Sequence, residues 1–243
     1  MLVRGPVTEF SKQAPLITCI NELICFGNRQ ASGFTSKRKG GAQMGAAIDF
    51  YFDFSSAYAY IAQARLDEFE RRHGVRFQMR PFSLGAVFKA LGSAPPDPTT
   101  PRGRYIYNDV GRCARQYGLA LNWPSQFPFN SIPAARAFYA ISETDPDGAS
   151  DFAKAAFAYA YGEGGDLADK AAILRLAADA GEDVAAAAAG LDGEPAKAAL
   201  KAATQAALER GVFGSPTFLV GDEMFWGADR LDQLGQWLER GGW

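Results

Sequence analysis

The sequence is poor in the residues that disulfide frameworks, dithiol sites and metal centres require. It contains three cysteines, Cys19, Cys25 and Cys113, and no Cys-x-x-Cys pair. This argues against a disulfide scaffold, a zinc ribbon and dithiol catalysis by the usual motif. The single histidine is His73, so a metal site built from several histidines is excluded and we expect no bound metal. A Ser-His-Asp triad would have to use this one residue.

Strong net charge and long apolar runs are also missing. The formal net charge is -2 over 243 residues, which gives no electrostatic basis for nucleic-acid binding. No apolar run reaches the roughly 18 residues needed to span a bilayer. Hydrophobic residues nevertheless make up 48% of the chain, enough for a substantial core. We therefore expect a globular, cytoplasmic protein with neither a membrane nor a nucleic acid as partner.

Residues 1–43 differ in composition from the rest of the chain. They combine a short apolar run, ITCINELICF, with a polar, glycine-rich and basic stretch, and regular periodicity begins only after Met44. This basic stretch lies far from Met1, which fits a secretory signal poorly. We expect residues 1–43 to be a poorly ordered extension, or Met44 to be the natural start; a targeting arm is the alternative.

The segment that follows has the pattern of a strand, a helix and a second strand. The aromatic run AIDFYFDF predicts a buried strand. Apolar residues at helical spacing from Tyr60 to Phe69 predict one continuous helix that ends at Gly74. The alternating run VRFQMRPF predicts the second strand, parallel to the first. His73 falls in the last helical turn, where it interacts favourably with the helix dipole, and we expect it to be structural.

The middle of the chain changes to helices broken by proline-rich loops. Short helices flank the loop APPDPTTPRG, a second loop contains NWPSQFPFNSIP, and nearly everything from residue 134 to 210 is typical of alanine-rich helix. We expect no strand there. Beyond it, GVFGSPTFLV and MFW predict an antiparallel hairpin. The run GADRLDQLGQWLERGGW predicts a closing helix, with Asp229 or the preceding turn at its N-terminus.

Together these segments predict an α/β protein with a thioredoxin-like fold and a large all-helical insertion between its β-α-β and β-β-α halves. We expect residues 44–84 and 211–243 to form the thioredoxin-like domain and residues 85–210 to form the helical insertion domain. Ligands of such sheets bind at the carboxyl ends of the strands. Ser55 and Ser56 follow the first strand at that edge.

These two serines have a structural and a functional interpretation. Serine is among the best N-cap residues, and the junction alone favours a simple cap. A helix N-terminus also stabilises an anion, and a hydroxyl donor beside a thiolate would lower the pKa of the thiol. Both interpretations stay open on these residues alone.

The run FGSPTF favours the functional interpretation of the serines. It places Pro216 directly before a strand, where proline is unfavourable without a special turn. A cis Ser215–Pro216 bond would explain this position and would expose the backbone N–H and C=O of Ser215 to an extended peptide. In a thioredoxin-like sheet the turn lies beside the first helix. Ser56 and Pro216 would then frame a pocket for a cysteine-containing peptide.

Five runs together resemble the 2-hydroxychromene-2-carboxylate isomerase family, which belongs with kappa-class glutathione transferases and DsbA-like proteins. They are DFYFDFSSAYAY, PFSLGAVFKALG, GRYIYNDVGRCARQYG, FPFN and RGVFGSPTFLVGDEMFWGADRLDQL. The resemblance covers about residues 47 to 240. It implies a thioredoxin fold with an inserted helical domain, glutathione as cofactor, a small aromatic carboxylate as substrate, and a homodimer.

The resemblance also implies roles for particular residues. Ser56 matches the family's catalytic serine, which contacts the glutathione sulfur, and Ser55 is the ordinary member of the pair. Ser215 and Pro216 match the turn that pairs with the glutathione backbone, and Ala228 and Asp229 match the pair that holds its γ-glutamyl end. In the inserted half the implied contacts are Arg102 to glutathione and Lys89, Ser93 and Asn130 to the substrate, with Lys89 or Arg102 anchoring the substrate carboxylate.

The chain departs from the family pattern at several positions, including Ala59, where the family often has serine. Ala57 stands where the family often has proline, Ser93 stands where asparagine is common, and Cys113 replaces a frequent aromatic residue. Alanine keeps a good helix propensity, so these changes bear on the substrate and not on the fold.

We predict a glutathione-dependent isomerase of 2-hydroxychromene-2-carboxylate or a related intermediate of aromatic-compound degradation, with Ser56 stabilising the glutathione thiolate. A kappa-like glutathione transferase that conjugates electrophiles would share the pocket and is the first alternative. A non-catalytic thioredoxin-fold protein that binds extended peptides is the alternative from another class. Dithiol oxidoreductase activity is least favoured, because Ser56 and Ala59 occupy the two positions that cysteines would need.

Overall fold

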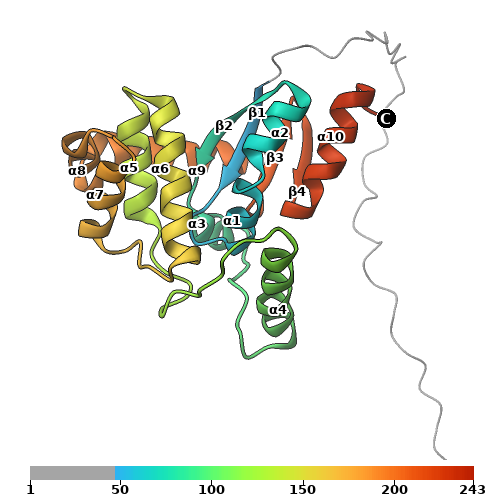
Figure 1. The fold of residues 1–243 in the computed structure, drawn as a ribbon, viewed down its shortest axis with the longest axis horizontal. Helices are drawn as coiled ribbons and strands as arrows, with labels where there is room; N and C mark the ends of the chain where they lie inside the picture. Colours follow the sequence, from blue (N-terminus) through green and yellow to red (C-terminus); the bar gives the residue numbers. More distant parts are fainter. Residues whose placement is uncertain (1–46) are drawn as a thin grey trace, which may run out of the picture. The chain divides into compact units, whose positions relative to one another are not determined.

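The computed structural model describes residues 47–243. The expected extension over residues 1–43 lies outside the described residues. Within them, the sheet has the order β2-β1-β3-β4 (Figure 1). Its strands are β1 (Ala47–Phe52), β2 (Arg76–Pro81), β3 (Thr217–Val220) and β4 (Glu223–Trp226). β1 and β2 are parallel, while β3 is antiparallel to both β1 and β4, which confirms the predicted parallel pair and the C-terminal hairpin.

Two short helices replace the single helix predicted between β1 and β2. They are α1 (Ala57–Gln63) and α2 (Leu66–His73), and the break falls at Ala64 and Arg65. The Arg65 guanidinium donates to the Ala228 carbonyl at 3.0 Å and to the Asp232 carboxylate at 2.8 Å. The prediction of one continuous helix is wrong here, because these tertiary contacts outweigh a local helix propensity that is only a weak prior.

The end of α2 at Gly74 confirms the prediction. Gly74 ends α2 in the left-handed conformation, with φ of 66°, a backbone region that glycine enters without steric cost. His73 packs its ring against Phe69, with centroids 4.4 Å apart, and lies 3.6 Å from the Glu239 carboxylate. The contacts of this histidine are therefore those of a packed residue in the last turn of a helix.

The segment between β2 and β3 is helical, as predicted. It contains α3 (Leu84–Ala90), α4 (Pro101–Gln116), α5 (Ile132–Ser142), α6 (Pro146–Phe157), a π-helix (Ala158–Gly162), α7 (Lys170–Asp179), α8 (Val184–Asp192) and α9 (Glu194–Glu209). After β4 come a 3₁₀ turn (Ala228–Arg230) and α10 (Leu231–Arg240). This order confirms the thioredoxin-like fold with a helical insertion. No helix in residues 47–243 is long and apolar enough to cross a membrane.

β1 forms the centre of the core because its side chains alternate between two apolar layers. Phe50 stacks on Phe52 and Phe218, with ring centroids 4.9 and 5.1 Å apart, in the layer that also contains α1 and α2. Tyr51 points to the opposite layer, where Val87 of α3 pairs with residues of α9. The inserted helices therefore help to cover the sheet itself, and the domain boundaries at residues 84 and 211 stay a prediction.

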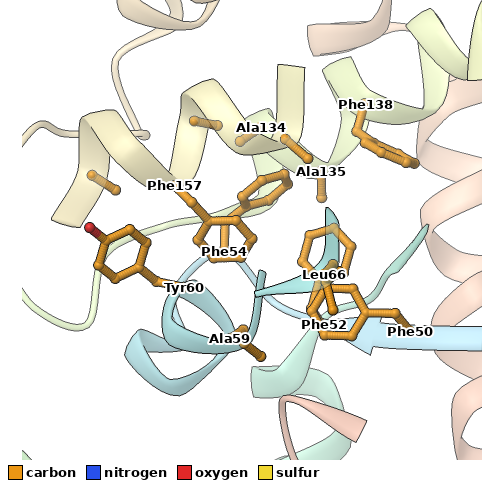
Figure 2. Packing of buried hydrophobic residues seen from close by; sticks show 14 of the residues in the cluster. Phe50, Phe52, Phe54, Ala59, Tyr60, Leu66, Ala134, Ala135, Phe138 and Phe157 are labelled. Atoms are coloured by element: carbon orange, nitrogen blue, oxygen red, sulfur yellow. The ribbon is translucent and has the colours of Figure 1, made fainter. Parts of the chain in front are cut away.

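The end of β1 joins the sheet to the inserted helices. Phe52 and Phe54 lie against Phe157 of α6, with ring centroids 5.5 and 5.0 Å apart, and Phe52 also meets the edge of Phe138 from α5 (Figure 2). All of these rings are nearly inaccessible to solvent. The residues directly after them, Ser55 and Ser56, are thereby brought to the junction between the sheet and the insertion.

We expect Phe50→Ala to lower the free energy of unfolding by about 3–5 kcal/mol, because it leaves a cavity among stacked rings. Phe213 is 44% exposed and provides a matched control: Phe213→Ala should cost about 1 kcal/mol, most of it the loss of one aromatic pair. Urea unfolding of the two variants beside the wild type measures both values. Equal losses would contradict a core centred on β1.

Candidate active site

Ser56 caps the first helix and contacts the turn before β3. Its backbone is extended and its Oγ accepts the N–H of Ala59 at 3.2 Å, which confirms the predicted N-cap. Its hydroxyl donates to the carbonyl oxygen of Ser215 at 2.9 Å. The residue is only 8% exposed, and its hydroxyl lies between the N-terminus of α1 and a backbone carbonyl 159 residues further along the chain.

The Ser215–Pro216 bond is cis, as predicted. The turn is tied to the rest of the site on both sides. The Ser215 hydroxyl accepts the Asp53 N–H at 3.0 Å, and the Pro216 carbonyl accepts the Gly227 N–H at 3.0 Å. The segment that carries Ala228 and Asp229 is therefore attached to the same turn that contacts Ser56.

A buried carboxylate, that of Asp53, organises the polar end of the site. Its Oδ1 accepts the N–H and the hydroxyl of Ser55, both at 2.8 Å, and the hydroxyl of Ser131 at 2.6 Å. Its Oδ2 accepts the N–H of Leu84 at 2.7 Å. An ionised group that is 4% exposed is costly to bury unless donors surround it. These four hydrogen bonds satisfy the carboxylate and join β1 to the beginnings of α3 and α5.

A cavity of about 610 Å³ opens beside Ser56. Its walls come from the N-terminus of α1, from α3 and α4, from the loop before α5, and from the turn before β3. Most of the large side chains in the lining are aromatic: Tyr58, Phe88, Tyr107, Trp123, Phe127, Phe129, Phe213 and Trp226. Among residues 47–243, Arg102 is the one cation that lines it.

Three of these aromatic rings form a continuous wall on the side of the insertion. Tyr107 and Trp123 have centroids 4.5 Å apart, and Phe127 meets the edges of both at 5.8 and 4.9 Å. Arg102 lies in the first turn of α4, the helix that also carries Tyr107. Phe213 and Trp226, which also line the cavity, form a second pair with ring centroids 4.8 Å apart. The cavity thus combines aromatic faces with the positive charge of Arg102.

The hydroxyl of Tyr58 is not suited to act as an acid or a base. It donates to the Asp109 carboxylate at 2.8 Å. Burial raises the pKa of Tyr58, and the hydrogen bond to Asp109 raises it further. The phenol therefore stays protonated at neutral pH and contributes a ring to the cavity, while its hydroxyl fixes α1 to α4.

Five of the residues predicted to bind glutathione or the substrate line this cavity: Ser56, Ser93, Arg102, Asn130 and Ser215. Pro216 is buried directly behind Ser215. Lys89 is exposed and does not line the cavity. Ala228 uses its carbonyl to accept from Arg65, and the Asp229 carboxylate is exposed, 3.4 Å from Arg230. The roles assigned to these residues stay predictions.

Sequence reasoning missed Asp53 and Ser131. One signal for Asp53 was available, because an acidic residue between Phe52 and Phe54 interrupts an aromatic run that ends a strand. A buried acid at such a place needs several donors. No local pattern indicated Ser131, which reaches Asp53 only through the folding of the loop before α5.

Comparison with known proteins identifies the family. The model of the DSBA-like thioredoxin domain matches residues 47–239. The chain belongs to this family.

Individual relatives and a solved structure show which members of the family the chain resembles. The chain is 34% identical to the 2-hydroxychromene-2-carboxylate isomerase of Sphingobium xenophagum, over 80% of this chain and 99% of the relative. It is 23% identical to the glutathione S-transferase kappa 1 of Rattus norvegicus, over 77% of this chain and 88% of the relative. A solved structure of 2-hydroxychromene-2-carboxylate isomerase matches with a TM-score of 0.72 and 30% identity, over 79% of this chain and 94% of that one. These matches confirm the family resemblance drawn from the motifs and support an enzymatic function.

We expect Asp53→Asn to lower the free energy of unfolding by about 3 kcal/mol, because the amide nitrogen cannot accept the hydrogen bonds that it would face. Asp49 on the same strand is a matched control, since its carboxylate is partly exposed and pairs with Arg80 at 3.0 Å. Asp49→Asn should cost less than about 1 kcal/mol. Denaturant midpoints of both variants test this, and equal destabilisation would contradict an organising role for Asp53.

Proposed function

We propose that the protein is a glutathione-dependent isomerase of 2-hydroxychromene-2-carboxylate or a related aromatic acid. The observation that carries the proposal is the Ser56 hydroxyl. It lies at a helix N-terminus and against the Ser215 carbonyl, at the edge of an aromatic cavity that Arg102 also lines. The isomerase relatives support the reaction, and the kappa-class relative supports glutathione.

The residues present fit a glutathione thiol. The N-terminus of α1 supplies backbone N–H groups and a partial positive charge. Ser56 supplies a hydroxyl, and Ser215 supplies a carbonyl that an extended peptide can pair with. The Asp229 carboxylate, on the segment attached to the Ser215–Pro216 turn, is suited to the ammonium of the γ-glutamyl end. The cavity volume of about 610 Å³ falls within the range usual for small-molecule sites.

Glutathione, when bound, would supply a thiolate that adds to the substrate, permits rotation about a former double bond and leaves. The chain's own contribution is to hold negative charge at the sulfur. The Ser56 hydroxyl donates a charge-assisted hydrogen bond, and the dipole of α1 favours the anion. Both effects lower the pKa of the thiol, so that more of it is ionised at neutral pH.

The aromatic end of the cavity would hold the substrate. The wall formed by Tyr107, Trp123 and Phe127 offers flat apolar faces to a ring. Arg102, which lines the cavity, would pair with the carboxylate, because a guanidinium matches a carboxylate with two parallel hydrogen bonds. The homodimer implied by the family belongs to the proposal as well.

Ser56→Ala should still bind glutathione while isomerase turnover at neutral pH falls by about 10- to 100-fold, because the thiol pKa rises by about one to two. The loss should shrink as pH rises through the new thiol pKa, since the thiolate then forms without the hydroxyl. Ser55→Ala is the neighbouring control and should reduce stability more than turnover. Assays on 2-hydroxychromene-2-carboxylate with and without glutathione measure these effects. Full activity in Ser56→Ala, or turnover without glutathione, would contradict the mechanism.

Arg102→Gln should raise the KM for the aromatic acid by about 10- to 100-fold, as expected for a lost charge-assisted contact. Lys89→Gln also removes one positive charge, but outside the cavity. It should change KM less than about twofold, because an exposed charge contributes little. Steady-state kinetics on both variants distinguishes the two cations. If Arg102→Gln weakens only glutathione binding in a calorimetric titration, Arg102 belongs to a glutathione carboxylate instead.

A kappa-like transferase is the second candidate, favoured by the kappa-class relative. It would use the same Ser56 and differ in the electrophile that the thiol attacks. Stable conjugation of a model aryl halide, without isomerase turnover, would select it. Binding of extended peptides without any binding of glutathione would select the non-catalytic alternative.

A further inference from the structure

The hydroxyl of Tyr161 is a buried polar group that makes no hydrogen bond. The residue is 0% exposed, and within residues 47–243 its Oη has no hydrogen-bond partner. A buried hydroxyl of this kind destabilises the folded state, and such groups are rare in native proteins. Phenylalanine would fill the same space among aromatic rings without that cost. A role in binding would explain why the position carries a hydroxyl.

The ring of Tyr161 lies directly behind rings that line the cavity. Its centroid is 6.2 Å from that of Trp123, 6.4 Å from that of Phe127 and 6.1 Å from that of Phe129, and these three rings are part of the lining. Trp123 and Phe127 belong to the loop between α4 and α5 and are only partly buried. Rotation of one of these two side chains would open the cavity to the hydroxyl.

The backbone of Tyr161 is attached to the same loop. The residue lies in the π-helix Ala158–Gly162, a form found frequently at functional sites. Its carbonyl accepts the Asn122 N–H at 2.6 Å, and Asn122 directly precedes Trp123. This bond fixes Tyr161 relative to the aromatic wall, so a ring held on the wall lies close to the hydroxyl.

The charge near Tyr161 limits what its hydroxyl can bind. Burial raises the pKa of Tyr161, and the negative charge of Asp53 raises it further. The phenol therefore keeps its proton and is available as a donor. The same negative charge disfavours an anionic acceptor at this place, because like charges repel strongly in a site shielded from water. A neutral oxygen is the acceptor that fits.

We propose that Tyr161 is a specificity-determining residue that donates a hydrogen bond to a neutral oxygen attached to the benzene ring of the substrate. This inference rests on the proposed function, in which the substrate is an aromatic acid. In 2-hydroxychromene-2-carboxylate that atom is the ring oxygen, and it becomes a phenol oxygen when the ring opens. Tyr161 keeps its own proton throughout. The carboxylate is left to Arg102, so the two polar groups of the substrate have different partners.

Two acids that differ in one hydroxyl test this role. They are 3-(2-hydroxyphenyl)propanoate and 3-phenylpropanoate, neither of which has a double bond that a thiolate could attack. Their dissociation constants are measured by calorimetry on protein saturated with glutathione. The wild type should bind the hydroxylated acid about tenfold more tightly, as expected for one hydrogen bond in a buried site. Tyr161→Phe should bind the two acids equally, because only the hydroxylated one loses a contact.

Tyr60 provides the matched control. Its ring stacks on that of Tyr161, with centroids 5.4 Å apart, but its hydroxyl already donates to the Ala120 carbonyl at 2.8 Å. Tyr60→Phe should keep the preference of about tenfold and lower the urea midpoint of unfolding, since it leaves a carbonyl without its donor. Tyr161→Phe should not lower this midpoint, because the hydroxyl that it removes has no partner in the free protein.

The possible failures are distinguishable. Equal affinity of the wild type for the two acids would overturn the role of Tyr161 and leave the isomerase in place. So would a preference that persists in Tyr161→Phe or disappears in Tyr60→Phe, or a lowered urea midpoint for Tyr161→Phe. If the protein binds glutathione but neither acid, the aromatic-acid substrate of the proposed function is wrong, and the role of Tyr161 is overturned with it.

Discussion

The hydrogen bonds around the Asp53 carboxylate are the constraint on which the site depends. They join the end of β1 to donors 31 and 78 residues further along the chain, at Leu84 and Ser131. The backbone of the same residue adds two bonds: its N–H donates to the Ser215 hydroxyl, 162 residues away, and its carbonyl accepts the Ser56 N–H at 2.9 Å. One buried residue thus sets the relative positions of the α1 N-terminus, the beginnings of α3 and α5, and the turn before β3.

This arrangement divides the site into two ends with different chemistry. The thioredoxin-like half supplies the polar end, with Ser56, Ser215 and the N-terminus of α1. Much of the aromatic end comes from the insertion, through α4 and the loop before α5. A buried negative charge near a proposed thiolate is unfavourable in itself, and its four donors reduce that effect by spreading the charge of the carboxylate.

The sequence predicted most of the fold because the signals were local. Period-two aromatic residues in β1, the glycine at position 74, and proline-broken loops each report on the backbone of their own segment. The continuous helix over α1 and α2 was predicted wrongly for the opposite reason. Its break at Arg65 accompanies contacts with Ala228 and Asp232, which no local pattern contains.

For the site, the sequence by itself determined that a helix begins at the Ser55–Ser56 junction after a buried strand and that Pro216 needs a special turn. Both follow from the conformational preferences of a single residue. Only the tertiary structure decided that the Ser56 hydroxyl donates to the Ser215 carbonyl and that the Asp53 carboxylate accepts four hydrogen bonds. It also decided that Arg102 lines the cavity while Lys89 does not. The physical reason is that a hydrogen bond or a cavity wall depends on distances between residues far apart in the chain, and these exist only once the insertion has packed against the sheet.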